Sequence, residues 1–152
     1  MTSRVLIVDD EPANTMLLEA MLAEQPDLEI RSINESGLAE REFAEFEPDI
    51  LLLDLHMPKP DGIELLTRLR GPRAALGYLP VVVLTADTTR VARNSALLLG
   101  ADDFLIKPLD REEVLLRVRN LLHTRKLYAE LASAKEALER RTGSEGRTNQ
   151  AR

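Results

Sequence analysis

Five short apolar segments within the first 106 residues constrain the fold more than any other feature of this chain. They cover residues 5–8, 28–33, 50–53, 81–84 and 104–106. Four of them are continuous apolar runs, as in strands buried on both faces, and residues 28–33 partly alternate, as in an edge strand. Their starts lie roughly 20–30 residues apart, which leaves room for one helix between neighbouring strands. The pattern therefore predicts five strands separated by helices.

The segments between these runs have helical patterns. Apolar residues recur every three or four positions in each of them, and two begin with a capping-box pattern, Asp61 to Glu64 and Asp110 to Glu113. Strands that alternate with helices form a mostly parallel sheet with helices on both faces. Because crossover connections are right-handed, the order of the strands must be doubly wound. The predicted fold is α/β, a five-stranded (βα)5 sheet.

The chain changes character after residue 122. Leu127, Leu131, Ala134 and Leu138 form one apolar seam among charged residues, which is typical of a short coiled coil. Residues 1–122 are thus the predicted domain, and residues 123–141 extend its last helix, either as a dimer coil or as an unfolded stub. Residues 142–152 lack an apolar pattern and are predicted to be disordered.

Composition excludes several classes of function. There are no cysteines, so disulfide scaffolds, thiol nucleophiles and thiolate zinc sites are excluded. No apolar run exceeds four residues, whereas a membrane helix needs about 20 and a signal peptide roughly 7–15, so we expect a cytoplasmic chain without a membrane partner. Acidic residues outnumber basic ones over residues 1–110, which argues against direct binding of nucleic acid.

Polar residues follow four of the five strands at the point where each ends. Asp9 and Asp10 follow the first, Asp54 the third, Thr85 the fourth and Lys107 the fifth. The carboxyl ends of parallel strands meet at one edge of the sheet, where ligands bind. Carboxylates without cysteine or histidine favour Mg²⁺, Mn²⁺ or Ca²⁺, and a lysine and a hydroxyl suit phosphoryl oxygens. The set indicates a site for phosphoryl transfer.

These residues, in this order and spacing, resemble the receiver domain of two-component response regulators. The resemblance covers residues 4 to about 122 and implies the flavodoxin-like strand order 2-1-3-4-5. The elements that carry it are Asp9-Asp10, Asp54 with Met57-Pro58 and Asp61-Gly62, Thr85-Ala86, Phe104, and Lys107-Pro108. Their combination is far more specific than one short motif.

The resemblance implies a role for each residue of the site. Asp54 would accept a phosphoryl group from a sensor histidine kinase or phosphotransfer protein, and Thr85 and Lys107 would hold its oxygens. Mg²⁺, or Mn²⁺, would be bound by Asp10, by Asp54 and through a water by Asp9, with the backbone carbonyl of His56. The Lys107–Pro108 peptide would be cis, and Phe104 would turn inward when Thr85 moves toward the phosphate. The face made by the helix before residue 100, the fifth strand and the last helix would then repack.

Two other functions and several details stay open at this stage. The chain could be a constitutive coiled-coil adaptor, or a phosphatase with an aspartate nucleophile, although that class is typified by D-x-D after the first strand and this chain has Asp9-Asp10-Glu11. We expect a signalling domain rather than a turnover enzyme. The sequence does not identify the cognate kinase, the output function that the domain controls or the oligomeric state. The lifetime of the phosphoryl group, which His56 and Asp87 would influence, is also open.

Overall fold

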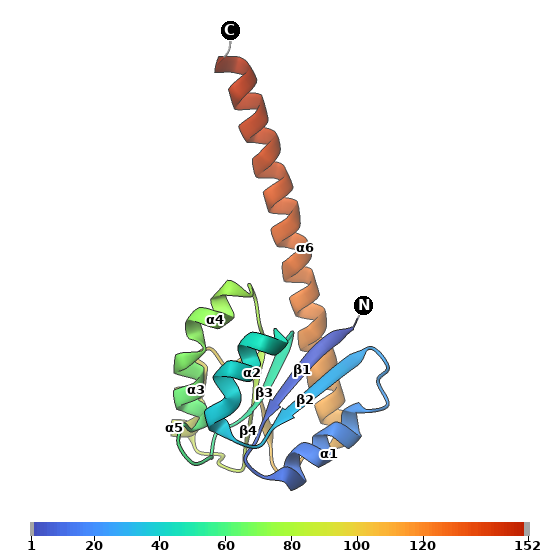
Figure 1. Cartoon of the computed structure of the whole chain (residues 1–152), viewed down its shortest axis with the longest axis vertical. Helices are drawn as coiled ribbons and strands as arrows, with labels where there is room; N and C mark the ends of the chain where they lie inside the picture. Colours follow the sequence, from blue (N-terminus) through green and yellow to red (C-terminus); the bar gives the residue numbers. More distant parts are fainter. Residues whose placement is uncertain (1, 151–152) are drawn as a thin grey trace.

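One parallel sheet of five strands organises the protein (Figure 1). The computed structural model describes residues 2–150, and the side chains of residues 2–143. The strand order is β2-β1-β3-β4-β5, as the sequence predicts. The strands are β1 (Ser3–Val8), β2 (Leu28–Ile33), β3 (Ile50–Asp54), β4 (Val81–Thr85) and β5 (Asp103–Ile106).

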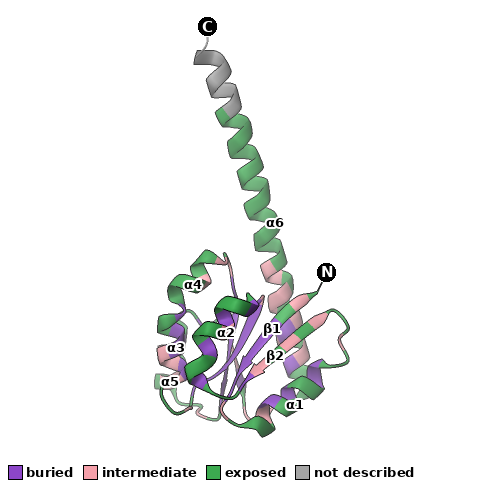
Figure 2. Ribbon diagram, viewed as in Figure 1, coloured by how far each residue is buried: buried purple, intermediate pink, exposed green. Residues whose placement is uncertain are grey.

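The apolar content of each strand matches its place in the sheet. All residues of β3 and β4 are buried. The edge strand β2 alternates between half-buried and exposed positions and ends in the buried Ile33. In β1, Leu6 and Val8 face one core cluster, and Val5 and Ile7 face the other. Figure 2 shows the buried residues concentrated in the central strands and on the helix surfaces that cover them. Both faces of the sheet are therefore apolar, which explains the continuous runs in the sequence.

Helices cover both faces of the sheet. The described helices are α1 (Pro12–Leu22), the short 3₁₀ helix η1 (Ser36–Leu38), α2 (Ala39–Phe46), α3 (Gly62–Arg68), α4 (Arg70–Ala75), α5 (Arg90–Leu98) and α6 (Arg111–Gln150). One core cluster packs α2, α3 and α5 against the sheet, and the other packs α1 and α6. The helix predicted from Asp61 onward ends at Arg68, and a second short helix, α4, follows it.

The helix α6 leaves the body of the protein and projects from it (Figure 1). Polar contacts hold its first turns. Arg119 forms two 2.7 Å hydrogen bonds with Asp27, lowering the pKa of Asp27 to about 2, and Arg125 Nε lies 3.1 Å from Asp49 Oδ1. The rings of Tyr78 and Tyr128 pack against each other in a tilted arrangement, with centroids 4.5 Å apart. The helix is thus attached to the body as far as Tyr128.

The tail of α6 extends further than its sequence pattern predicts. The helix continues to Gln150, whereas the apolar seam indicates an end near residue 141. Residues 151–152 and the side chains of residues 144–150 lie outside the described part. The predicted disorder of residues 142–152 and the domain boundary at 122 stay predictions. Over the range that the structure describes, every helix is too short or too polar to cross a membrane.

Candidate functional site: an acidic pocket at the carboxyl edge of the sheet

Three carboxylates meet where β1 and β3 end. Asp54 is the last residue of β3 and is only 3% exposed, Asp9 directly follows β1 and is fully buried, and Asp10 is half-buried. Each offers an oxygen that lies within 4.8 Å of the oxygens of the other two. The polypeptide brings them together because β1 and β3 are neighbours and run in the same direction. The sequence prediction that they share one edge is confirmed.

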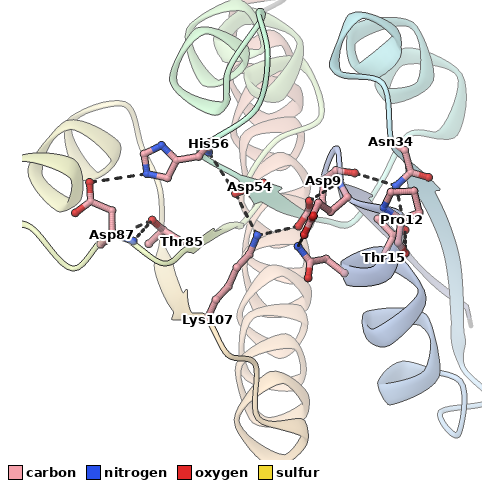
Figure 3. Close-up of polar contacts among 11 residues, drawn as sticks. Asp9, Pro12, Thr15, Asn34, Asp54, His56, Thr85, Asp87 and Lys107 are labelled. Carbon is pink, nitrogen blue, oxygen red and sulfur yellow. Dashed lines mark hydrogen bonds and ion pairs between the residues drawn. The ribbon is translucent and has the colours of Figure 1, made fainter.

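Lys107 provides the positive charge of this pocket. It follows β5, and its Nζ lies 3.1 Å from Asp9 Oδ2 and 3.4 Å from Asp54 Oδ1 (Figure 3). Burial and the neighbouring Asp9 carboxylate raise the pKa of Asp54 to about 6, although Lys107 and the N–H of His56 act in the opposite direction. One ammonium group does not balance three crowded carboxylates, and the pocket therefore attracts a further cation.

The residue set fits a hard divalent cation. Mg²⁺ is typically bound by oxygen donors from one or two carboxylates, and water and phosphate oxygens complete its coordination. The backbone N–H of His56 donates to Asp54 Oδ1 over 3.2 Å and fixes the rotamer of that side chain. That the carbonyl of His56 also binds the metal stays a prediction.

Thr85 ends β4 on the same edge and is 2% exposed. Its hydroxyl accepts a hydrogen bond from the backbone N–H of Asp87 over 2.9 Å, as Figure 3 shows. The carboxylate of Asp87 lies 3.8 Å from Nε2 of His56, whose side chain is 62% exposed. The hydroxyl of Thr85 is therefore hydrogen-bonded to the loop that follows β4. His56, in the loop after β3, lies next to Asp87, in the loop after β4.

Phe104 lies in β5 beside α5. Its ring packs at the margin of the core, and the guanidinium of Arg93 lies 5.5 Å from the ring centroid. A surface cavity of about 580 Å³ adjoins it, lined by Phe104 and by residues of the loop before α5 and of α5 itself, including Arg93 and Leu97. The ring therefore has open space on its outer side and the apolar core on its inner side.

Three features of the site escape sequence patterns. The Lys107–Pro108 peptide is cis, the geometry that the resemblance implies, but Lys59–Pro60 is also cis. Gly62 packs so closely that a Cβ there would lie 2.4 Å from the carbonyl oxygen of Asp54. Asn34, which follows β2, donates to the backbone of Asp9. Of Lys59–Pro60, Gly62 and Asn34, only Gly62 belongs to a motif quoted above, and that motif does not indicate how closely Gly62 approaches the end of β3.

Comparison with known proteins identifies the family. The model of the response regulator receiver domain matches residues 5–119, and the chain belongs to this family. Its receiver is a phosphoacceptor domain rather than an enzyme domain, and membership implies a histidine kinase as partner.

Individual relatives agree with this assignment. The chain is 40% identical over 120 residues to the transcriptional regulatory protein TrcR of Mycobacterium tuberculosis, covering 78% of this chain and 45% of the relative. It is 38% identical over 143 residues to the response regulator PleD of Caulobacter vibrioides, covering 94% and 31%. The chain thus spans less than half the length of these curated relatives.

Solved structures share the fold. A putative response regulator from Chloroflexus aurantiacus is 31% identical with a TM-score of 0.74, and the alignment covers 81% of this chain and 99% of that one. The receiver domain of a putative LuxO repressor protein from Vibrio parahaemolyticus has a TM-score of 0.76 at 22% identity, covering 86% and 98%. The second likeness concerns the fold alone.

Proposed function

We propose that this chain is a phosphorylation-controlled signalling switch in which Asp54 accepts a phosphoryl group from a histidine kinase or phosphotransfer protein. The observation that carries the proposal is the grouping of Asp54 with Asp9, Asp10 and the Nζ of Lys107 at one edge of the sheet. A buried carboxylate beside two further acids and one lysine is suited to binding a divalent cation and to accepting a PO₃ group.

The transfer requires few groups from the protein. A carboxylate oxygen of Asp54 attacks the phosphorus, the bond between phosphorus and the donor nitrogen or oxygen breaks, and the donor leaves with the electron pair. Asp9, Asp10 and Asp54 would hold Mg²⁺, which supplies positive charge to the phosphoryl oxygens when bound. Lys107 lies close enough to Asp54 to exchange its carboxylate partner for a phosphoryl oxygen.

The switch follows from Thr85 and Phe104. A phosphoryl group on Asp54 offers strong acceptor oxygens. The Thr85 hydroxyl would donate to one of them in place of its 3.4 Å hydrogen bond to the carbonyl oxygen of Asp87. The departure of Thr85 leaves space toward which Phe104 turns, and the face of α5, β5 and α6 repacks. The helix α5 exposes Leu97 (51%) beside Phe104, and α6 exposes Leu116 (63%). A partner or output domain would contact the face of α5, β5 and α6.

The test of the proposal is direct labelling of the full chain with a small acyl-phosphate donor. With Mg²⁺ we expect one phosphoryl group per chain, located at Asp54 by hydride reduction and peptide mass spectrometry, and with excess chelator we expect none. Labelling at another residue, or equal labelling in the presence of chelator, would contradict the proposed function.

We infer that the extension of α6 pairs with a second copy of the chain. Leu131 and Leu138 are 65% and 62% exposed beyond the last contact of α6 with the body, and Leu127, at the end of the attached part, is 50% exposed. Their spacing of four, three and four through Ala134 suits one coiled-coil seam. We infer a second copy as the partner because two identical seams, aligned in register, bury each leucine against the same leucine of the other chain.

If two copies pair through the seam, a substitution that disrupts the seam should lower the molar mass of the protein in solution from that of a dimer to that of a monomer. Leu131→Lys should convert a dimer into a monomer in light scattering, because a lysine in the seam loses apolar burial and repels its copy. The matched control is Ser133→Lys, which adds the same side chain off the seam. A parent chain that stays monomeric at high concentration, with and without beryllium trifluoride as a phosphoryl mimic, contradicts the pairing but leaves the phosphoacceptor proposal intact.

A further inference from the structure

The side chain of Asn34 links the end of β2 to the loop that carries the acid pair. Its amide nitrogen donates to the carbonyl oxygen of Asp9 over 2.9 Å and to Oγ1 of Thr15 over 3.0 Å (Figure 3). Thr15 is 3% exposed, and its hydroxyl donates onward to the carbonyl oxygen of Pro12 over 3.0 Å. One amide group therefore contacts the beginning of the loop and the first turn of α1.

Asp9 is held from two sides by these contacts. Its carboxylate points into the pocket, where Oδ2 meets Lys107 Nζ and Oδ1 accepts the N–H of Glu11 over 3.0 Å. Its carbonyl oxygen points away from the pocket, toward Asn34. That carbonyl belongs to the planar peptide group joining Asp9 to Asp10. The contact with Asn34 therefore limits rotation of this peptide group and helps to fix the position of the Asp10 Cα, which carries the second carboxylate.

Only a donor can serve at this position. A carbonyl oxygen accepts hydrogen bonds and the Thr15 hydroxyl already donates to Pro12, so both partners of Asn34 require a hydrogen-bond donor. The primary amide of asparagine provides two such donors on one short side chain. The N-cap residue of α1, Glu11, makes no side-chain capping bond, so Asn34 also contributes order at a helix start that lacks this support.

We propose that Asn34 is a positioning residue that sets the divalent-cation affinity of the acidic pocket by fixing the Asp9–Asp10 peptide. The proposal rests on the proposed function, because it assumes that Asp9 and Asp10 bind a cation. Groups that orient metal ligands from behind typically change metal affinity roughly 10- to 100-fold when removed. Asn34 is itself exposed to water and acts through the backbone, so a smaller effect, about 3- to 10-fold, is expected.

The experiment measures Mg²⁺ binding to the full chain by isothermal titration calorimetry, with no phosphoryl donor present. Asn34→Ala and Asn34→Leu both remove the hydrogen-bond donors. Alanine also reduces the volume of the side chain, whereas leucine does not, and each variant should raise the Mg²⁺ dissociation constant about 3- to 10-fold. Tyr78→Phe is the matched control, because it removes one hydrogen bond, to Asp102, in the loop before β4 at the opposite edge of the sheet. Its Mg²⁺ affinity should equal that of the parent.

A second measurement separates positioning from general loss of structure. At saturating Mg²⁺, the rate of labelling by the small phosphoryl donor should return to within about twofold of the parent in both Asn34 variants, since the acids themselves are unchanged. Unchanged Mg²⁺ affinity in both variants overturns the inference, as does a labelling rate that stays low at saturating Mg²⁺. A parent chain that binds no Mg²⁺ and takes no label refutes the proposed function instead, so the two failures are distinguishable.

Discussion

Asp54→Asn is expected to raise the free energy of unfolding by about 2 kcal/mol at pH 7 when divalent cations are absent. In the parent, burial and the Asp9 carboxylate make the ionised form of Asp54 unfavourable in the folded state. Asparagine removes that charge but keeps an oxygen that can accept the His56 N–H. The same substitution removes the proposed acceptor, so labelling by the small phosphoryl donor should disappear.

The gain in stability should depend on pH in one direction. The pKa of Asp54 is about 6 in the folded chain, against an ordinary value of 3.8. Below about pH 4 the carboxyl is protonated in both states, and the variant has no advantage. Between about pH 4 and 6 the unfolded chain releases the proton while the folded chain retains it, so the parent loses stability as the pH rises. Above pH 6 the loss approaches about 3 kcal/mol, and this figure already includes the opposing attraction of Lys107. Asparagine is expected to recover about 2 kcal/mol of it, because its amide is still a buried polar group.

Thermal unfolding at pH 3.5, 5 and 7 in the presence of chelator checks this expectation. About 2 kcal/mol corresponds to roughly 4–8 °C in a chain of this size. Asp61→Asn is the matched control, since Asp61 caps α3 by accepting the N–H of Glu64 and asparagine caps equally well. An Asp54→Asn variant less stable than the parent at pH 7, or a gain that persists at pH 3.5, would contradict the physical account of the pocket. Added Mg²⁺ should narrow the difference by stabilising the parent.

The strands and the polar residues at their ends could be predicted because burial on both faces leaves a signature in the sequence. A continuous apolar run ending in Asp54, Thr85 or Lys107 marks the edge of a parallel sheet without knowledge of any contact. Strand order then brings these residues together, and the structure confirms the grouping of the three acids.

Other parts of the site depend on distances between segments and leave no local pattern. An asparagine after a strand is typical of any loop, so the sequence does not mark Asn34. Its contact with the carbonyl oxygen of Asp9 is found only when the ends of β1 and β2 lie side by side. The attachment of α6 through Arg125 and Tyr128 likewise needs partners at Asp49 and Tyr78, far away in the sequence. The short helix α4 lacks an apolar face of its own, with no buried residue, so periodicity could not indicate it.

Gly62→Ala is expected to destabilise the protein by about 3 kcal/mol, the upper end of the usual range for overpacking. Gly62 is buried at the start of α3, where its N–H donates to the carbonyl oxygen of Leu55 over 3.1 Å. A Cβ at this position would lie 2.4 Å from the carbonyl oxygen of Asp54 and 2.7 Å from the Cα of Leu55. Both contacts are backbone atoms, so no flexible side chain can move aside, and the end of β3 must shift instead.

The consequence for the pocket makes this variant informative. A shift at the end of β3 displaces Asp54 relative to Asp9 and Lys107, so Mg²⁺ affinity should fall together with stability. Gly71→Ala is the matched control, because a Cβ there meets nothing within 4 Å and alanine favours the helix α4 by about 0.5–1 kcal/mol. Urea denaturation and Mg²⁺ titration of both variants measure the two effects. Equal stability of the two alanine variants would mean that the approach of Gly62 to the strand end is not tight, and that Asp54 is positioned by its own strand alone.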